Sequence, residues 1–338
     1  MIIAVDAMGG DYAPAEIVKG AAQGSKLYDV DVVLVGDENA IRAHLPAEFA
    51  KSNRIMIRHA AEAIGMHEHV NAVRTKKDAS VVVAASMVKD GQADAMVSMG
   101  NTAAAMAIAT LKLGRIKGID RPALVAVMPS KCGATILLDV GAVADCTVEN
   151  LMQFAVMGSI YAEKVFSIEN PRVGLLSIGE EKGKGNEVTR AAHEELACSS
   201  LNFIGNVEGR DVFSGAADVI VADGFAGNVA LKAAEGLADH VATLVKDELR
   251  SHPLAWVPIV LLSPSLKRLK KRLDYSEYGG APLLGVSGVC IIGHGRSKAR
   301  AIASAVRTAK EAVSGGVVST IRDSLAGAEE RACAVGSD

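Results

Sequence analysis

The chain begins with Met1-Ile2-Ile3-Ala4-Val5-Asp6-Ala7-Met8-Gly9-Gly10-Asp11, an apolar run that ends in a carboxylate and two glycines. A short apolar, β-branched run before a glycine turn predicts a buried strand over residues 2–5. An Ala-rich segment with helical periodicity follows, and a strand followed by such a helix is the repeating unit of a parallel sheet. The opening stretch therefore predicts an α/β fold.

The same strand and helix pattern recurs along the chain, which predicts a three-layer α/β/α fold with a mostly parallel sheet. We expect strands at residues 2–5, 31–35, 95–98, 124–128, 134–139, 173–178, 218–222 and 288–292. We expect residues 1–338 to form a single unit that carries a basic amphipathic insertion, the hook, at residues 251–275.

Composition and charge narrow the class of protein. Half of the residues are hydrophobic, and 36 Lys and Arg against 39 Asp and Glu give a net charge of −3. Such a composition excludes a disordered chain, and this charge argues against nucleic-acid binding, which needs a basic surface. The five cysteines contain no Cys-x-x-Cys pair, which favours a reducing cytoplasm. The longest apolar run, Trp256–Leu262, is much shorter than the roughly 20 residues that cross a bilayer.

Five turns that combine glycine with polar residues follow predicted strands. Glycine lets the backbone approach a ligand closely, and the unpaired amides of a following helix attract anions. Because ligands bind beyond the carboxyl ends of parallel strands, we expect the turns to gather at a single edge as a phosphate pocket. The turns are residues 6–11, 98–102, 179–186, 223–228 and 293–297. Walker A and complete Gly-x-Gly-x-x-Gly motifs are absent, which disfavours nucleotide hydrolysis and dinucleotide binding.

Taken together, these turns resemble those of the bacterial phosphate acyltransferases of phospholipid synthesis, the PlsX family. The resemblance extends over nearly the whole chain, in order. Its segments are residues 3–14, 73–78, 91–102, 179–186, 203–210, 223–228 and 277–281. The chain departs from the residues usual in that family at Tyr12, Ala79, Ala103 and Val143, so no role is carried over to those four positions.

The resemblance implies a function and a setting. Members of the family transfer a long acyl chain from acyl carrier protein to inorganic phosphate, and a membrane acyltransferase then uses the acyl phosphate on glycerol 3-phosphate. Their fold is similar to isocitrate and isopropylmalate dehydrogenases and to phosphotransacetylases, and they are homodimers. We therefore expect a cytoplasmic enzyme, peripherally associated with the inner membrane and its anionic surface, that needs no cofactor or metal.

Phosphate is already anionic near neutral pH, so its attack on a thioester needs no protein nucleophile. The site must instead bind the phosphate and stabilise the oxyanion. Lys184, between two glycines, is the expected anchor. Asn101, Asn186 and Asn228 could donate hydrogen bonds to phosphate or the oxyanion, or could cap helices. The other expected phosphate-binding residues are Gly100, Thr102 and Arg296.

Among the histidines, only His294 lies between glycines at a predicted strand end, so it could protonate the leaving sulfur or donate to phosphate. Asp223 is either a proton acceptor and lysine partner or a turn-stabilising residue. The amino-terminal motif offers the same choice between orienting a cation and stabilising a turn. Its residues are Asp6, Gly9, Gly10 and Asp11.

The hook combines the apolar run that contains Trp256 with a basic helix whose leucines recur at helical spacing. It could lie in a lipid interface, dock the acidic acyl carrier protein, or pack against the body or a second copy of the chain. The expected contact residues are Trp256, Leu266, Lys267, Arg268, Leu269, Lys270, Lys271 and Arg272.

Three alternatives to the acyltransferase remain open at this point. A short-chain phosphotransacetylase that uses coenzyme A would have no need of the hook. A non-catalytic membrane scaffold for lipid-synthesis enzymes would leave the five turns unused. A dehydrogenase of similar fold lacks support, because no paired nicotinamide and metal motifs are found.

Overall fold

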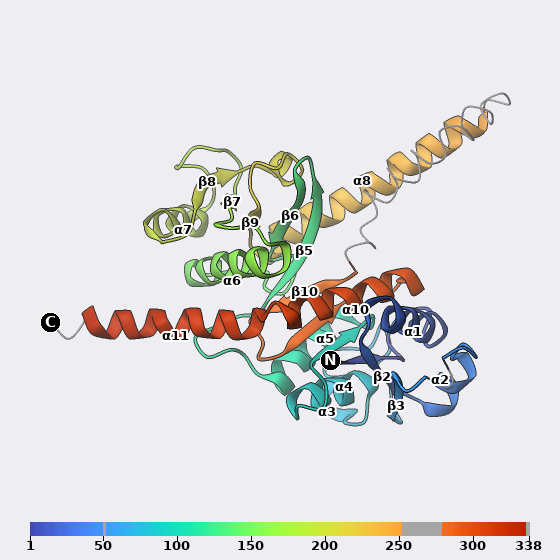
Figure 1. The fold of residues 1–338 in the computed structure, drawn as a ribbon. Helices are drawn as coiled ribbons and strands as arrows, with labels where there is room; N and C mark the ends of the chain where they lie inside the picture. Colours follow the sequence, from blue (N-terminus) through green and yellow to red (C-terminus); the bar gives the residue numbers. More distant parts are fainter. Residues whose placement is uncertain (50–51, 252–278, 336–338) are drawn as a thin grey trace.

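The computed structural model describes residues 1–49, 52–251 and 279–335, and its core is one mixed sheet of eleven strands (Figure 1). The strand order is β3-β2-β1-β4-β11-β10-β5-β6-β9-β7-β8. In chain order the strands are β1 (Ile2–Asp6), β2 (Asp31–Gly36), β3 (Ile55–His59), β4 (Ala95–Ser98), β5 (Ala123–Ser130), β6 (Gly133–Leu138), β7 (Val173–Leu176), β8 (Phe203–Val207), β9 (Val219–Val221), β10 (Ala281–Leu284) and β11 (Val289–Ile292).

Helices cover both faces of this sheet. They are α1 (Ala15–Tyr28), α2 (Glu38–His44), α3 (Ala72–Thr75), α4 (Ser80–Lys89), α5 (Thr102–Ile108), α6 (Val148–Phe166), α7 (Glu187–Cys198), α8 (Gly224–Ser251), α10 (Ala299–Ser314) and α11 (Val317–Val335). A π-helical turn, Ala109–Leu113, continues α5, and a 3₁₀ turn, Gly209–Val212, follows β8. Figure 1 shows α8 and α11 projecting from the body.

The alternation of side chains in the strands explains the three layers. In β1, Ile3 and Val5 point into the core beneath α1, α6, α10 and α11, whereas Ala4 points into the core beneath α4 and α5. Because both faces are buried, the strand is apolar at almost every position. Close packing of α1 on α10 needs small residues, and a Cβ on Gly20 would lie 2.5 Å from the Ala299 carbonyl oxygen. The predicted three-layer α/β class is confirmed.

All eight predicted strands are present, with ends shifted by two residues at most. Three further strands, β3, β8 and β10, were not predicted. The edge strands β3 and β8 bury only part of their side chains, so their hydrophobic pattern is weak. Proline normally argues against an interior strand, and Pro282 lies in β10. The predicted hook falls on residues 252–278 and lies outside the described residues, apart from its first residue, Ser251, which ends α8.

One expectation about the sheet is wrong. Three antiparallel pairings, β11 with β10, β10 with β5 and β5 with β6, occur in the middle of the sheet. An odd number of antiparallel pairings reverses the strand direction, so β6, β9, β7 and β8 run opposite to β1, β4 and β11. The five glycine turns therefore do not gather at a single edge.

Candidate active site

Asp6, at the end of β1, is the buried centre of the first group of site residues. Its carboxylate accepts the Ser80 hydroxyl at 2.5 Å and the Ser98 hydroxyl at 2.7 Å. Burial raises the pKa of Asp6, while hydrogen bonds from the two serines oppose that effect. Sequence reasoning singled out neither serine, although Ser98 stands at a strand exit. Asp6 thus joins the end of β1 to β4 and α4.

Three glycine turns meet next to Asp6 in direct backbone contact. A Cβ on Gly9 would lie 2.8 Å from the Gly100 nitrogen, and one on Gly10 would lie 3.2 Å from the Gly295 carbonyl oxygen. The Asp11 amide donates to that same Gly295 oxygen at 2.8 Å. The turns after β1, β4 and β11 are therefore packed as one surface, which we call the glycine cluster, and a Cβ at Gly9 would require the backbone at Gly100 to shift.

His294 is exposed on the glycine cluster, and its tautomer follows from its surroundings. The Arg296 amide donates to His294 Nδ1 at 3.3 Å. A ring nitrogen that accepts a hydrogen bond carries no proton, so the neutral ring has its proton on Nε2. His294 therefore presents an N–H donor. Arg296 is also exposed.

Asn101 uses its side chain within the fold. Its Oδ1 accepts the Ala104 amide at 3.1 Å and caps α5, and its Nδ2 donates to the carbonyls of Met66 and Glu68 at 2.9 and 3.2 Å. Of the two roles that the sequence left open for this side chain, the helix cap is confirmed. What remains for an anion here is the backbone near Gly100 and the exposed Thr102.

A second group of residues follows β6 and β9. Asp139 is fully buried and accepts the amides of Leu124, Ala142 and Val143 at 2.7 to 3.0 Å. Burial raises its pKa, and these backbone donors act in the opposite direction. Asp223 accepts the Ala226 amide at 2.7 Å and so caps α8. Asn228, one turn further along α8, is exposed beside Gly141.

The loop between β7 and α7 carries Lys184, and it lies beside the second group because β7 pairs with β9. Lys184 is exposed, and its stem lies against Gly179, where a Cβ would be 2.8 Å from Lys184 Cγ. Asn186 Oδ1 accepts the amide and hydroxyl of Thr189, both at 2.8 Å, and caps α7. Its Nδ2 stays available to a ligand.

The structure thus gathers the predicted residues into two sets, not one. Within residues 1–49, 52–251 and 279–335, no hydrogen bond or ion pair joins His294 to Lys184 or Asn228.

No group of three His, Cys, Asp or Glu side chains in the described part of the chain is arranged to hold a metal ion. No described helix is both long enough and apolar enough to cross a membrane. All eight of the predicted lipid or carrier contacts, from Trp256 to Arg272, lie outside the described residues.

Comparison with known proteins decides the family. The profile of the family described as "Fatty acid synthesis protein" matches residues 1–320. A "Phosphate acyltransferase" of Pelotomaculum thermopropionicum is 53% identical over 326 residues, which are 96% of this chain and 95% of that protein. The chain belongs to the PlsX family of phosphate acyltransferases. A second "Phosphate acyltransferase", from Desulfitobacterium hafniense, is 52% identical over 327 residues, which are 96% of this chain and 98% of that protein.

The fold of this phosphate acyltransferase is also found elsewhere. A phosphotransacetylase from Streptococcus pyogenes superposes with a TM-score of 0.61 at 18% identity, over 93% of this chain and 94% of that one. This likeness concerns the fold alone. The predicted family and enzyme class are confirmed: the phosphate acyltransferase acts in fatty acid and phospholipid synthesis. The non-catalytic scaffold is therefore wrong as an alternative.

Proposed function

We propose that the enzyme transfers a long-chain fatty acyl group from the thioester of acyl carrier protein to inorganic phosphate. A phosphate oxygen attacks the thioester carbonyl carbon, the new C–O bond forms, and the C–S bond breaks. The products are acyl phosphate and the free carrier thiol, and the proton that the sulfur gains equals the proton that hydrogen phosphate loses. The site therefore needs anion binding, an oxyanion donor and a proton carrier.

The observation that supports this reaction most is the exposed Nε2–H of His294 on the glycine cluster. The Arg296 amide fixes the ring orientation through Nδ1. The Nε2–H of His294 can then donate a hydrogen bond to the leaving sulfur, while the proton that hydrogen phosphate loses passes to that sulfur.

The second set of residues supplies the remaining charges in this proposal. Lys184 neutralises the phosphate, with the free Nδ2 of Asn186 and the guanidinium of Arg296 as further donors. Asn228 donates to the oxyanion, and Asp223 orients Lys184 while it caps α8. This assignment requires both sets to face one bound phosphate, and the kinetics of the His294 and Lys184 variants below test it.

Phosphate-dependent release of the free carrier thiol from palmitoyl acyl carrier protein tests this assignment. We expect His294→Ala to lower kcat about 100-fold, because it removes a hydrogen-bond donor to developing negative charge, and Lys184→Ala to raise the phosphate KM about tenfold. His44→Ala and Lys89→Ala change exposed residues of the same types at the ends of α2 and α4 and should have wild-type kinetics. Full activity in both site variants would overturn the site. Faster turnover of a short-chain acyl coenzyme A than of palmitoyl acyl carrier protein would contradict acyl carrier protein as the acyl donor.

The proposal also covers the partners and the location of the enzyme. The acidic carrier protein and an anionic membrane surface are complementary to the five cations of the hook, from Lys267 to Arg272. Peripheral binding to the inner face of the membrane would deliver the acyl phosphate directly to a glycerol-3-phosphate acyltransferase. Leu266→Asp with Leu269→Asp should abolish flotation with liposomes of anionic lipid, and unchanged flotation would contradict the membrane role of the hook.

We also propose a homodimer. The exposed face of α8 carries four apolar side chains between 47% and 64% exposed, at steps of three or four residues, apart from one adjacent pair: Leu237, Val241, Leu244 and Val245. An apolar stripe of this length on a surface helix is typical of an interface. A second copy of the chain offers the same stripe and so matches it by symmetry.

A further inference from the structure

A buried series of hydrogen bonds connects α7 and β8 to the loop that carries Lys184. His193, on α7, and Asn206, on β8, are only 5% and 6% exposed. His193 Nδ1 lies 2.9 Å from Asn206 Oδ1, and Asn206 Nδ2 donates to the Glu181 carbonyl at 2.9 Å. The edge of Phe203 packs against the His193 ring. Burying a polar group costs free energy unless it is hydrogen-bonded, so the side chains of His193 and Asn206 are held in the positions that keep these bonds.

The donors and acceptors of the chain can be assigned. Asn206 has one donor group and one acceptor group on its side chain, and the Glu181 carbonyl can only accept. Nδ2 must therefore face Glu181, which leaves Oδ1 for His193. It follows that His193 Nδ1 carries a proton and donates it. The order of donation runs from His193 to Asn206 to the backbone of Glu181.

The Glu181 carbonyl is where this chain reaches the candidate phosphate anchor. The same oxygen also accepts the Lys184 amide at 3.0 Å, closing the turn from residue 181 to residue 184. Asn206 thus holds the oxygen about which the Lys184 backbone folds. The other side of the loop is fixed where the Lys184 stem lies against Gly179.

We propose that Asn206, oriented by His193, is a positioning residue that sets the place of Lys184 for phosphate binding. The inference rests on the proposed role of Lys184 as the phosphate anchor and deepens it. Neither residue touches phosphate. A misplaced Lys184 weakens binding of phosphate and leaves the acyl donor unaffected, so the effect appears in one KM only.

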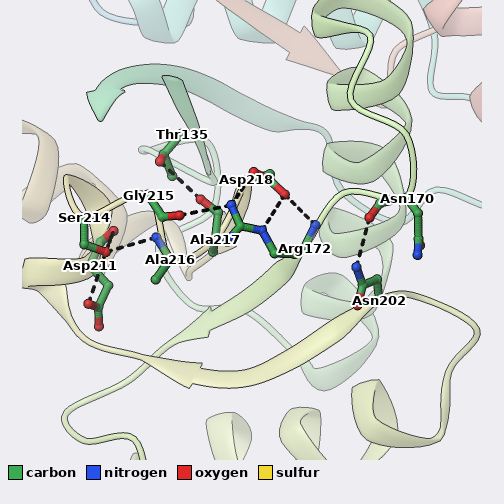
Figure 2. A network of polar contacts seen from close by, with 10 residues as sticks. All are labelled: Thr135, Asn170, Arg172, Asn202, Asp211, Ser214, Gly215, Ala216, Ala217 and Asp218. Carbon is green, nitrogen blue, oxygen red and sulfur yellow. Dashed lines mark hydrogen bonds and ion pairs between the residues drawn. The ribbon is translucent and has the colours of Figure 1, made fainter. Parts of the chain in front are cut away.

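Asn206→Asp tests the bond to Glu181 because it keeps the acceptor for His193 and replaces the donor by an oxygen. We expect the phosphate KM to rise about tenfold, with the KM for the acyl donor within about twofold of wild type. Asn206→Ala removes both bonds and should give the same KM change, which keeps the test valid if the buried carboxylate prevents folding. The matched control is Asn202→Ala, which removes an asparagine-to-carbonyl bond of equal length, to Asn170, at the other end of β8 (Figure 2).

The His193 variants separate positioning from packing. His193→Asn places an amide donor near the position of Nδ1, whereas His193→Leu fills the space without a donor. We expect His193→Asn to keep a phosphate KM near that of wild type and His193→Leu to raise it about as much as Asn206→Asp does. Limited trypsin cleavage after Lys182 and Lys184 should be faster in His193→Leu than in His193→Asn, which reports the loop without activity.

The outcomes separate two claims: that Lys184 anchors phosphate, and that Asn206 and His193 position Lys184. If Lys184→Ala raises the phosphate KM but Asn206→Asp, Asn206→Ala and His193→Leu do not, the positioning role is wrong and the anchor stands. If Lys184→Ala itself leaves the phosphate KM unchanged, the anchor is wrong. An Asn202→Ala variant with the same rise in phosphate KM would also overturn the inference, because the effect would then belong to β8 in general.

Discussion

The Ser98 hydroxyl, at the end of β4, donates to Oδ2 of Asp6, at the end of β1, at 2.7 Å. Ser98 and Asp6 are 92 residues apart in sequence and face each other in the register of the parallel pair. With Ser80 on Oδ1, the carboxylate is satisfied from both sides inside the protein. The ends of β1 and β4 and the turns that follow them are thus fixed to one another by a single titratable group.

Asp6→Asn should change how stability depends on pH. Burial raises the pKa of Asp6 above 3.8, so the folded state binds a proton more tightly than the unfolded state does. The free energy of unfolding therefore falls as pH rises from 3.8 through the folded pKa. Denaturant titrations from about pH 4 to about pH 8 should show a smaller fall in Asp6→Asn than in the wild type. Part of the fall remains, because burial also raises the pKa of Asp139.

Ser98→Ala is the companion variant to Asp6→Asn and acts in the opposite direction. It removes a donor to the charged carboxylate, which raises the pKa of Asp6 further and extends the fall in stability to higher pH. If the unfolding free energy had the same pH dependence in wild type, Asp6→Asn and Ser98→Ala, the raised pKa of Asp6 would not be the cause of that dependence.

Gly9→Ala should damage the glycine cluster. The new methyl group would overlap Asp6 Oδ2 and lie 2.8 Å from the Gly100 nitrogen. We expect a loss of about 1–3 kcal/mol in stability and a fall of about 100-fold in kcat, because three loops must shift. Gly236→Ala, where nothing lies near the added Cβ, should instead stabilise α8 by about 0.5–1 kcal/mol. Thermal unfolding and steady-state kinetics of both variants check this contrast.

Arg172→Ala should reduce stability without affecting catalysis. Figure 2 shows the Arg172 guanidinium on Asp218, with Nε and Nη2 at 3.0 and 2.8 Å from the carboxylate oxygens and Nη2 also on the Gly215 carbonyl. These residues lie at the amino ends of β7 and β9, away from the site loops. The Arg172 side chain is 41% exposed, so solvent screening limits the loss to about 1–2 kcal/mol near neutral pH.

The loss in Arg172→Ala should itself depend on pH. Burial raises the pKa of Asp218, but the hydrogen bonds and charge of Arg172 prevail and hold that pKa below 3.8. The stabilisation is therefore present above 3.8 and disappears as pH falls through the folded pKa. Urea denaturation at neutral and acidic pH measures the difference. An equal loss at both would assign it to packing, and a fall in kcat would place Arg172 in the site.

Leu237→Asp with Leu244→Asp should turn the proposed dimer into a monomer. The charges would lie on the apolar stripe of α8, where a second copy would have to bury them. Light scattering after gel filtration should then give the mass of one chain in place of two. Leu27→Asp is the matched control, because Leu27 is 68% exposed on α1 and outside the stripe. Two chains in the double variant would remove α8 from the interface.

Local sequence patterns were sufficient to predict most of the strands and the family of this protein. Apolar runs such as Ile2–Val5 give strands that are buried on both faces, because the hydrophobic pattern depends only on the residues themselves. The glycine turns after β1 and β4, and the family that they indicate, were also read from sequence. The residues around Asn186, by contrast, are compatible with both a helix cap and a ligand contact, and only the fold shows that its Oδ1 accepts the amide and hydroxyl of Thr189 in α7.

The tertiary structure alone decided the rest. Strand direction depends on how strands pair in the folded sheet. Because β10 is antiparallel to both of its neighbours, it leaves β5 parallel to β11. The antiparallel pairing of β5 with β6 then reverses the second half of the sheet and divides the expected pocket into two sets. The partners of buried polar groups are likewise decided by three-dimensional packing: Ser80 reaches Asp6 across 74 residues, and Asn206 reaches Glu181 across 25. Sequence determined which residues have useful chemistry, and packing determined which of them meet.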